Sequence, residues 1–193
     1  AFRPAYPGNA LYWLWSPQYG FAHSFQLGGW NEAMIGYLLA IASPTHPIPA
    51  FCYAQGWARF GAMVNGRSFY GLPLFVGPDW GGGLYLNQYT FMTLDPRFKR
   101  DAYANYEAQC RNASEIDRLY CAANPGGHAG YSGEVWGITA SDDPWGYSAR
   151  GPYSNDNGTL APTAALGMMP FTYGHSLAAL KAMYRTYGAR LWG

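Results

Sequence analysis

The longest unbroken hydrophobic run in this chain extends from Ala33 to Ala42, and every residue in it is apolar or glycine. The run predicts a helix, and a helix that is apolar all round is expected to be buried on every side. Pro44, Pro47 and Pro49 end it, because proline lacks an N–H and constrains the residue before it. The run is too short for a membrane span, which takes about 20 residues. We therefore expect this helix to lie at the centre of the fold.

A longer helix is predicted over residues 98–123, where apolar side chains recur at spacings of three and four. The sequence Asn-Pro-Gly-Gly at 124–127 ends it. The remaining pattern predicts helices at 49–62, 84–94, 159–168 and 176–192, a loop or hairpin at 66–83, and extended or looped chain at 10–25. Residues 130–158 show little periodicity and are expected to form one long, functional loop. Together the elements predict an all-α protein with little strand.

The composition favours a neutral, hydroxylated ligand. Charged residues make up 12% of the chain and aromatic residues 18%, with a net charge of +1. No run of Lys or Arg is present, so nucleic acid and anionic membrane surfaces are poor partners. A sugar ring has apolar C–H faces that lie on Trp and Tyr rings, while its hydroxyls bind amides and carboxylates. The alternative is that most of these rings are core residues.

Carboxylates and aromatic rings are the groups with which this chain could do chemistry. Cys52, Cys110 and Cys121 have no metal-like spacing with the histidines, so we expect small buried thiols, no metal and no cofactor. Glycoside hydrolysis needs two carboxyl groups flanking the bond and a platform for the sugar. Glu32, at the start of the apolar helix, is the candidate for one carboxyl group. Its alternative is a structurally paired carboxylate.

Six blocks of the sequence resemble the glucoamylase-like domain of endo-β-1,2-glucanases (glycoside hydrolase family 144). The blocks are WSPQYGF, GWNEAMIGYLLAIASPTHPIP, GPDWGGGLYLNQYTF, YCAANP, WGITASDDPWGY and DNGTLAPTAALGMMPFT, and they follow the family order over almost the whole chain. The resemblance implies an (α/α)6 toroid that cleaves β-1,2-glucan to short sophoro-oligosaccharides, with inversion and without a metal. The family's acid in the WNEA block falls on Glu32, which implies that Glu32 is the catalytic proton donor.

The resemblance also implies that part of the family's domain is not in this chain. The family's other acids, in a D-x-x-E arrangement on an earlier helix, have no counterpart here. We therefore expect residues 1–193 to be a single glucoamylase-like catalytic domain, incomplete at both ends, that holds the C-terminal half of the toroid. The family further implies a periplasmic or secreted protein with a β-glucan substrate, monomeric when complete.

Further acids and tryptophans are candidates for contact with the substrate. The predicted substrate-binding residues are Trp30, Glu134, Trp136, Asp142, Trp145 and Asp156. For the three tryptophans the alternative is packing in the core. Glu134 could instead form a structural pair, and Asp156 could instead cap the helix that follows it.

Two other functions fit the same residues. The first is that of a domain that makes or transglycosylates cyclic β-1,2-glucans, since the same domain type occurs there. The second is a non-catalytic glucan-binding protein, because a domain without the partner acid would lack half of its catalytic pair.

Overall fold

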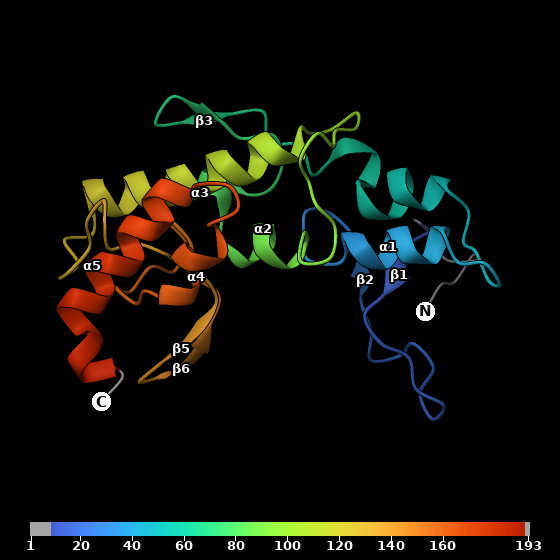
Figure 1. Ribbon diagram of the computed structural model, residues 1–193. Coiled ribbons are helices and arrows are strands. Elements are labelled where there is room, and N and C mark those ends of the chain that lie inside the picture. Colours follow the sequence, from blue (N-terminus) through green and yellow to red (C-terminus); the bar gives the residue numbers. More distant parts are fainter. Residues whose placement is uncertain (1–8, 192–193) are drawn as a thin grey trace.

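The computed structural model describes residues 9–191, and helices dominate it (Figure 1). The α-helices are α1 Met34–Ile41, α2 Tyr85–Tyr89, α3 Tyr106–Ala123, α4 Pro162–Gly167 and α5 Tyr173–Leu191. Shorter helical turns are a π-helical turn at Tyr53–Trp57 and 3-10 turns at Arg59–Gly61 and Asp79–Gly81. The prediction of a mainly helical protein is confirmed.

Three antiparallel pairs of short strands complete the described part. They are β1 Leu11–Tyr12 with β2 Gln26–Leu27, β3 Ser68–Phe69 with β4 Leu72–Pro73, and β5 Ser141–Asp143 with β6 Gly146–Ser148. The hairpin predicted within 66–83 is β3–β4. β5–β6 forms within the predicted loop at 130–158. β1 lies in the segment 10–25 predicted as extended or looped chain, and β2 lies directly after that segment.

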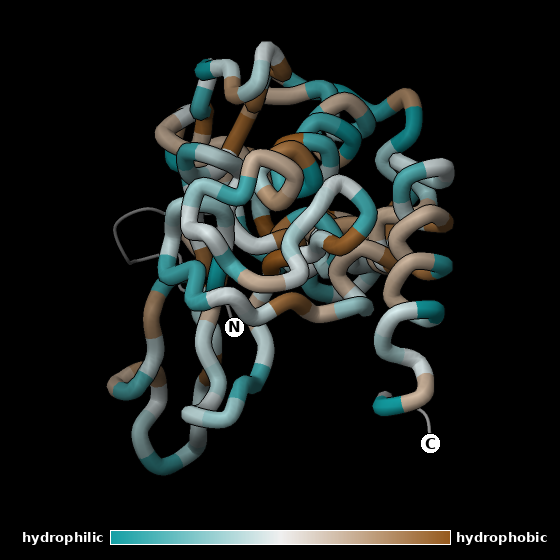
Figure 2. Tube along the Cα trace, turned by 90° about the vertical axis from the view of Figure 1, so that its left-hand side faces the viewer, coloured by the Kyte–Doolittle hydropathy of each residue, from teal (hydrophilic) through white to brown (hydrophobic). Residues whose placement is uncertain are grey.

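The two unexpected strand pairs project from the same side of the molecule (Figure 1). α3 runs along the opposite side, with α4 and α5 near one end, α1 near the other and α2 between them. Figure 2 shows that most hydrophobic segments lie within the packed body, whereas the loops extending below it are mainly white to teal. The β1–β2 hairpin and the β5–β6 hairpin are thus two projecting arms, and α2 and the start of α1 lie between them.

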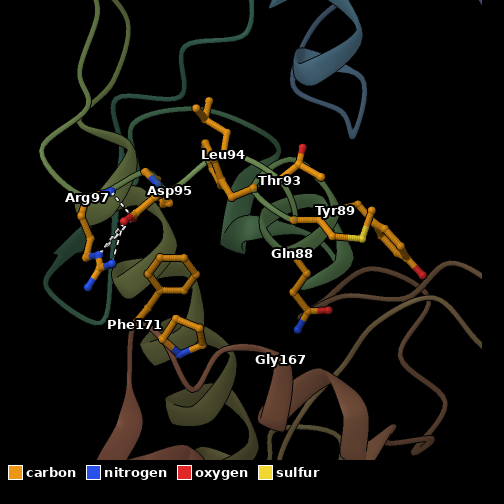
Figure 3. Close-up of a pocket in the computed structure, with 12 residues that line it drawn as sticks. Gln88, Tyr89, Thr93, Leu94, Asp95, Arg97, Gly167 and Phe171 are labelled. Carbon is orange, nitrogen blue, oxygen red and sulfur yellow. Dashed lines mark hydrogen bonds and ion pairs between the residues drawn. The ribbon is translucent and has the colours of Figure 1, made fainter. Parts of the chain in front are cut away.

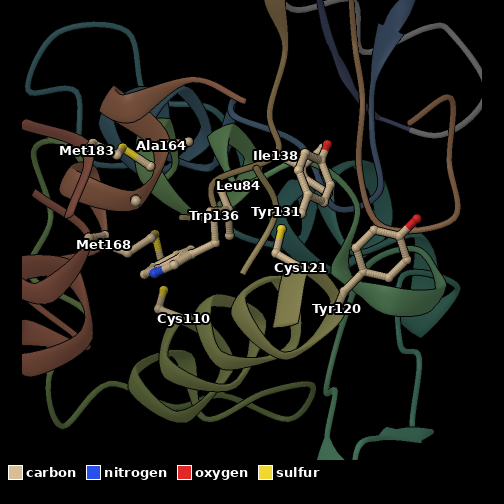
Figure 4. Packing of buried hydrophobic residues seen from close by; sticks show 12 residues of the cluster. Leu84, Cys110, Tyr120, Cys121, Tyr131, Trp136, Ile138, Ala164, Met168 and Met183 are labelled. Carbon is tan, nitrogen blue, oxygen red and sulfur yellow. The ribbon is translucent and has the colours of Figure 1, made fainter. Parts of the chain in front are cut away.

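The body contains two main hydrophobic clusters. One joins α3, α4 and α5 to the 136–138 segment, and Trp136 lies at its centre (Figure 4). The other joins α1 to the π-helical turn and the start of α3, with Trp30 and Trp57 in contact. Phe91, just after α2, packs against both clusters. α2 is therefore the element that ties the two halves together.

The expectation that α1 is buried on every side is wrong. Met34 and Tyr37 are buried, but Leu39 is 65% exposed. The buried side packs on the π-helical turn, and the Tyr37 hydroxyl donates to Leu27 O at 2.5 Å and accepts from Leu11 N–H at 2.9 Å. No element in the described part of the chain covers the side of α1 that carries Leu39, so this apolar helix has one exposed face.

α3 begins eight residues later than its apolar spacing predicts. Phe98 has a left-handed backbone with φ 61° and is exposed, so no helix forms there. The helix starts after Asn105, whose side chain accepts a hydrogen bond from Ala108 N–H at 3.1 Å and acts as the N-cap. It ends at Asn124 in the left-handed conformation, as the Asn-Pro-Gly-Gly sequence predicts.

The last two predicted helices are confirmed as α4 and α5, with the break at Pro170 between them. Residue 192, included in the last prediction, lies outside the described residues. The three cysteines are free and buried, as expected. Among residues 9–191 no helix is both long enough and apolar enough to cross a membrane.

Candidate active site

Glu32 is an exposed side chain on a main chain that the core holds in place. Its neighbour Trp30 is buried between Trp57 and Tyr106. On the other side, the Asn31 side chain accepts from Ala33 N–H at 2.8 Å. The buried Thr90 hydroxyl lies 3.0 Å from Asn31 O and 2.6 Å from Leu86 O. The turn before α1 is thereby fastened to α2, and the carboxyl group of Glu32 extends from it into solvent.

A pocket of about 690 Å³ opens around Glu32. Its walls are mainly apolar and aromatic, and Glu32 is the charged side chain among the described residues that line it. The lining residues are Trp13, Phe25, Gln26, Leu27, Gly28, Asn31, Glu32, Ala33, Ile35, Tyr89 and Met92. A mostly apolar pocket with a few polar groups is the usual form of a small-molecule site.

Trp13 and Phe25, which the sequence reasoning missed, form one wall of this pocket. Their rings stack with centroids 5.8 Å apart and planes 11° apart. The bond from Trp13 N–H to Phe25 O, 3.0 Å long, extends the β1–β2 ladder by one pair. The signal in the sequence was the succession of aromatic residues on both sides of the Ser16-Pro17 turn, which is typical of a hairpin.

Tyr85, at the start of α2, lies within electrostatic reach of Glu32. Burial raises the pKa of its phenol, and the electrostatic influence of the Glu32 carboxylate and the Tyr147 phenol raises it further. The Tyr85 N–H donates to Thr139 Oγ1 at 3.1 Å, which holds the 136–139 segment against α2. Tyr147 is on β6, so the β5–β6 hairpin lies within electrostatic reach of Tyr85.

A buried ion pair braces the β5–β6 hairpin. Arg150 pairs with Asp143 and also donates to Ser141 O at 3.0 Å and Ser148 O at 3.2 Å. The Asn157 amide and the Trp145 N–H donate to Asp143 and, with the Arg150 charge, lower the pKa of its carboxyl group. The brace leaves the tip of the hairpin free to present side chains.

Two predicted substrate-binding residues stand on that hairpin. Trp145 is at its tip and is 83% exposed. Asp142 is exposed and lies opposite Tyr147 across the strand pair. Both side chains are open to a ligand, although neither lines the pocket around Glu32.

Trp30 and Trp136 are core residues, so the expectation that their rings are sugar platforms is corrected. Trp136 is fully buried and lies between Cys110 and Met168 (Figure 4). Trp30 is stacked on Tyr106 with centroids 6.0 Å apart. Large rings at these positions fill the two hydrophobic clusters and leave no face for a ligand.

Asp156 holds a buried cluster and is not the N-cap of α4, whose N-cap position is Ala161. Its carboxylate accepts from the Tyr120 hydroxyl at 2.9 Å, the Tyr131 hydroxyl at 2.7 Å and Gly158 N–H at 3.1 Å. His128 Nε2 lies 3.2 Å from it. With its carboxylate occupied by these partners, Asp156 stabilises the fold and is not available to a substrate.

Glu134 is exposed in a turn next to α3 and does not line the pocket around Glu32. The ion pairs found among residues 9–191 do not include it, so the structural-pair alternative gains no support. The structure thus separates Glu134 from Glu32.

Asp117 is a buried carboxyl group that the sequence reasoning missed. It accepts from the N–H groups of Gly137 and Ile138 at 3.1–3.2 Å. Burial raises its pKa well above the ordinary value, although these two bonds oppose the shift. The sequence signal for its burial was its spacing on α3: Asp117 lies four residues after Ala113 and three before Tyr120, at a position where apolar residues recur. It anchors the 137–138 segment and does not face the pocket.

A second pocket, of about 700 Å³, lies beyond the end of α2 and is lined partly by Phe171 and Leu94 (Figure 3). It shares Tyr89 and Met92 with the pocket around Glu32. At its edge Arg97 donates to Asp95 through Nε at 2.9 Å and through a terminal nitrogen at 2.7 Å, which lowers the Asp95 pKa to about 2. This pair neutralises its own charges at the rim.

No group of three or more potential metal ligands occurs within residues 9–191. The arrangement around Glu32 is a carboxylate in a mainly apolar and aromatic pocket of about 690 Å³.

Similar proteins share this arrangement of helices. The exo-β-1,2-glucooligosaccharide sophorohydrolase (non-reducing end) of Parabacteroides distasonis is 40% identical over 95% of this chain. A crystal structure of the endo-β-1,2-glucanase from Chitinophaga pinensis, in complex with sophorotriose and glucose, matches 95% of the chain with 40% identity and a TM-score of 0.91. The β-1,2-glucanase structure from Parabacteroides distasonis matches the same share with 39% identity and a TM-score of 0.89.

The chain spans 28% of the length of the curated relative, 45% of the Chitinophaga structure and 29% of the Parabacteroides structure. The family model Glycoamylase, described as "Putative glucoamylase", matches residues 24–193. The resemblance seen in the sequence is confirmed, and the chain belongs to this glucoamylase-like family.

Proposed function

We propose that this chain is the part of a glycoside hydrolase that carries the proton-donating carboxyl group for cleavage of β-1,2-glucan to sophoro-oligosaccharides. The observation that carries the proposal is Glu32, an exposed carboxyl group on a fixed turn inside an aromatic pocket. The names of the relatives, two of them β-1,2-glucanases and one a sophorohydrolase, supply the linkage.

In this mechanism Glu32 protonates the glycosidic oxygen as the bond to the leaving sugar breaks. A second carboxyl group activates water on the opposite face of the sugar ring, and the configuration inverts. Among the described residues that line the pocket, Glu32 supplies the one carboxyl group. The second carboxyl group of the proposed mechanism therefore belongs to a residue that is not among these lining residues.

We also propose that the chain forms one half, the C-terminal half, of an (α/α)6 toroid. Its helical structure and its coverage of 45% of the Chitinophaga structure support this architecture. The exposed side of α1 fits the proposal, since a further layer of the ring would cover it.

A second candidate function is glucan binding without cleavage. The single carboxyl group in the pocket favours it, because hydrolysis needs two. The experiment that separates the two uses the full-length protein that contains this chain. It is incubated with linear β-1,2-glucan, and in parallel with β-1,3- and β-1,4-glucans. Products are followed by chromatography and binding by calorimetry.

Release of short sophoro-oligosaccharides from β-1,2-glucan alone supports hydrolysis. Binding of β-1,2-glucan without products supports the binding function. Products from another glucan, with none from β-1,2-glucan, overturn the linkage.

A further inference from the structure

The Trp13–Phe25 pair is built as a rigid, solvent-facing surface. The two rings stack almost in parallel, so Phe25 supports one face of the Trp13 indole. The main chain beneath them is fixed by the β1–β2 ladder, the Trp13 N–H to Phe25 O bond and a bond of 3.0 Å from Leu14 N–H to Ser24 Oγ. An indole held in this way loses little freedom when a ligand lies on it.

The indole stays open to solvent although it is supported. Trp13 is 61% exposed, and Phe25 is exposed to a similar extent. Exposing two large stacked rings is unfavourable unless something covers them. Because Phe25 occupies one face, the other face of the indole is the one that a ligand would contact.

The pair belongs to the same pocket as the candidate catalytic acid. Trp13, Phe25 and Glu32 all line it. Trp15, two residues further along the same loop, is 55% exposed but does not line the pocket. Trp13 and Trp15 are both exposed, so exposure does not distinguish them as ligand-binding candidates. Trp13 is the candidate because it lines the same pocket as Glu32.

We propose that Trp13 is the sugar-stacking platform of a subsite beside Glu32, and that Phe25 is a positioning residue that holds the indole from behind. The ligand is a glucosyl unit whose C–H face lies on the indole while the bond to the neighbouring unit reaches Glu32. The assignment rests on the proposed function for the identity of the sugar, and on the geometry of the pocket for the place where it binds.

The first test compares hydrolysis of β-1,2-gluco-oligosaccharides by Trp13→Ala, Trp13→Phe and Trp15→Ala variants of the full-length protein that contains this chain. Loss of one stacking contact is expected to raise KM about tenfold in Trp13→Ala with kcat changed less, which is a loss of uniform binding. Trp13→Phe keeps a ring on Phe25 and is expected to recover most of the affinity. Trp15→Ala is expected to match the wild type within about twofold.

Phe25→Ala tests the positioning role. It is expected to raise KM less than Trp13→Ala does, and to have no further effect when it is combined with Trp13→Ala, because a support without its platform has nothing to position. Additive effects of the two substitutions overturn the positioning role of Phe25. Thermal unfolding of each variant checks that the fold is intact.

The second test measures binding alone, so that it does not depend on cleavage. Sophorotriose is titrated into Glu32→Gln, Glu32→Gln/Trp13→Ala and Glu32→Gln/Trp15→Ala, and heat is recorded. An affinity loss of about tenfold on Trp13 replacement alone supports the platform. Equal affinity in all three proteins, or no binding by Glu32→Gln, overturns it.

The two tests separate the platform from the proposed function. If the full-length wild-type protein releases no products but the titration shows the loss at Trp13, hydrolysis is overturned and the platform stands. If the wild type cleaves β-1,2-glucan and Trp13→Ala has an unchanged KM, the function stands and the platform is overturned.

Discussion

Gly83 lies directly against the main-chain carbonyl of Arg150: a Cβ on Gly83 would stand 2.5 Å from that oxygen. One residue away the crossing is as tight, since a Cβ on Gly151 would stand 2.5 Å from the carbonyl carbon of Gly82. The glycine run before α2 is therefore the place where the chain leaving β6 crosses the chain entering α2. This crossing sets the β5–β6 hairpin close to the start of α2, where Tyr85 lies.

Gly83→Ala is expected to destabilise the protein by about 2–4 kcal/mol, because a methyl group cannot share this space with backbone atoms. Gly174→Ala is the matched control: no heavy atom lies within 4 Å of its added Cβ, in the first turn of α5. Its effect should stay within about 1 kcal/mol, in the stabilising direction. Chemical denaturation measures both, and equal midpoints for the two variants would contradict the crossing.

In the full-length protein, Glu32→Gln is expected to lower kcat on β-1,2-glucan by about 10²–10⁴, because glutamine cannot donate the proton. Stability should change little, since the side chain is exposed and outside the core. Glu107→Gln serves as control, because Glu107 forms a surface ion pair with Arg111 on α3 at 2.8 Å. Turnover by Glu32→Gln equal to that of Glu107→Gln would remove Glu32 from the mechanism.

Trp145→Ala is expected to weaken glucan binding several-fold, by about 1 kcal/mol, and to leave the melting temperature unchanged. The hairpin tip offers the ring to solvent, while the Asp143–Arg150 pair holds the hairpin itself. Tyr173→Ala removes an exposed ring at the start of α5 and is the control. Binding isotherms that coincide for both variants would exclude Trp145 as a sugar platform.

Asp156→Ala is expected to destabilise the protein by about 2–4 kcal/mol, because the Tyr120 and Tyr131 hydroxyls lose their acceptor. Asp142→Ala, at an exposed position on β5, should change stability by less than about 0.5 kcal/mol. Urea unfolding of the two variants measures the difference. Equal stabilities would show that the hydroxyls find other partners.

Asp117 should give the protein a stability that falls as the pH rises. Its folded-state pKa is raised by burial, so the unfolded chain ionises first, from about pH 4 upward. The contribution is complete below that pH and is lost as the pH climbs toward the raised folded-state value. Asp117→Asn removes this slope, and unfolding curves from pH 4 to pH 8 measure it. Parallel pH profiles for wild type and variant would contradict the shift.

The sequence predicts most helices because the local signals are strong. The Asn-Pro-Gly-Gly sequence after α3 and the proline before α5 end or interrupt a helix through local backbone constraints, so they predict its ends whatever the tertiary structure. The start of α3 is misplaced because spacing alone does not register the N-cap at Asn105 or the left-handed Phe98. The burial of α1 is overestimated. An apolar sequence indicates that a helix is to be covered, but it does not show whether the covering elements are part of this chain.

The site is predicted less completely than the fold. Glu32 is predicted from one motif and Trp145 from its neighbours in the sequence, and their roles stay predictions. Trp13 and Phe25 are twelve residues apart in the sequence and meet through a strand pair of two residues per strand, too short for a periodic signal. Asp156 is misassigned because its partners Tyr120 and Tyr131 come from segments that only the tertiary fold brings together.

The hydrogen bond between Asn31 and Thr90 fixes the position of Glu32 independently of the aromatic side chains on the two hairpins. The main chain that carries Glu32 is fixed to a helix shared by both hydrophobic clusters, so it tolerates little alteration. The aromatic rings of the two arms stand on surface hairpins whose bonds are local. On the proposed function, substrate preference can thus be redesigned on the two hairpins by side-chain exchange, while Glu32 keeps its place.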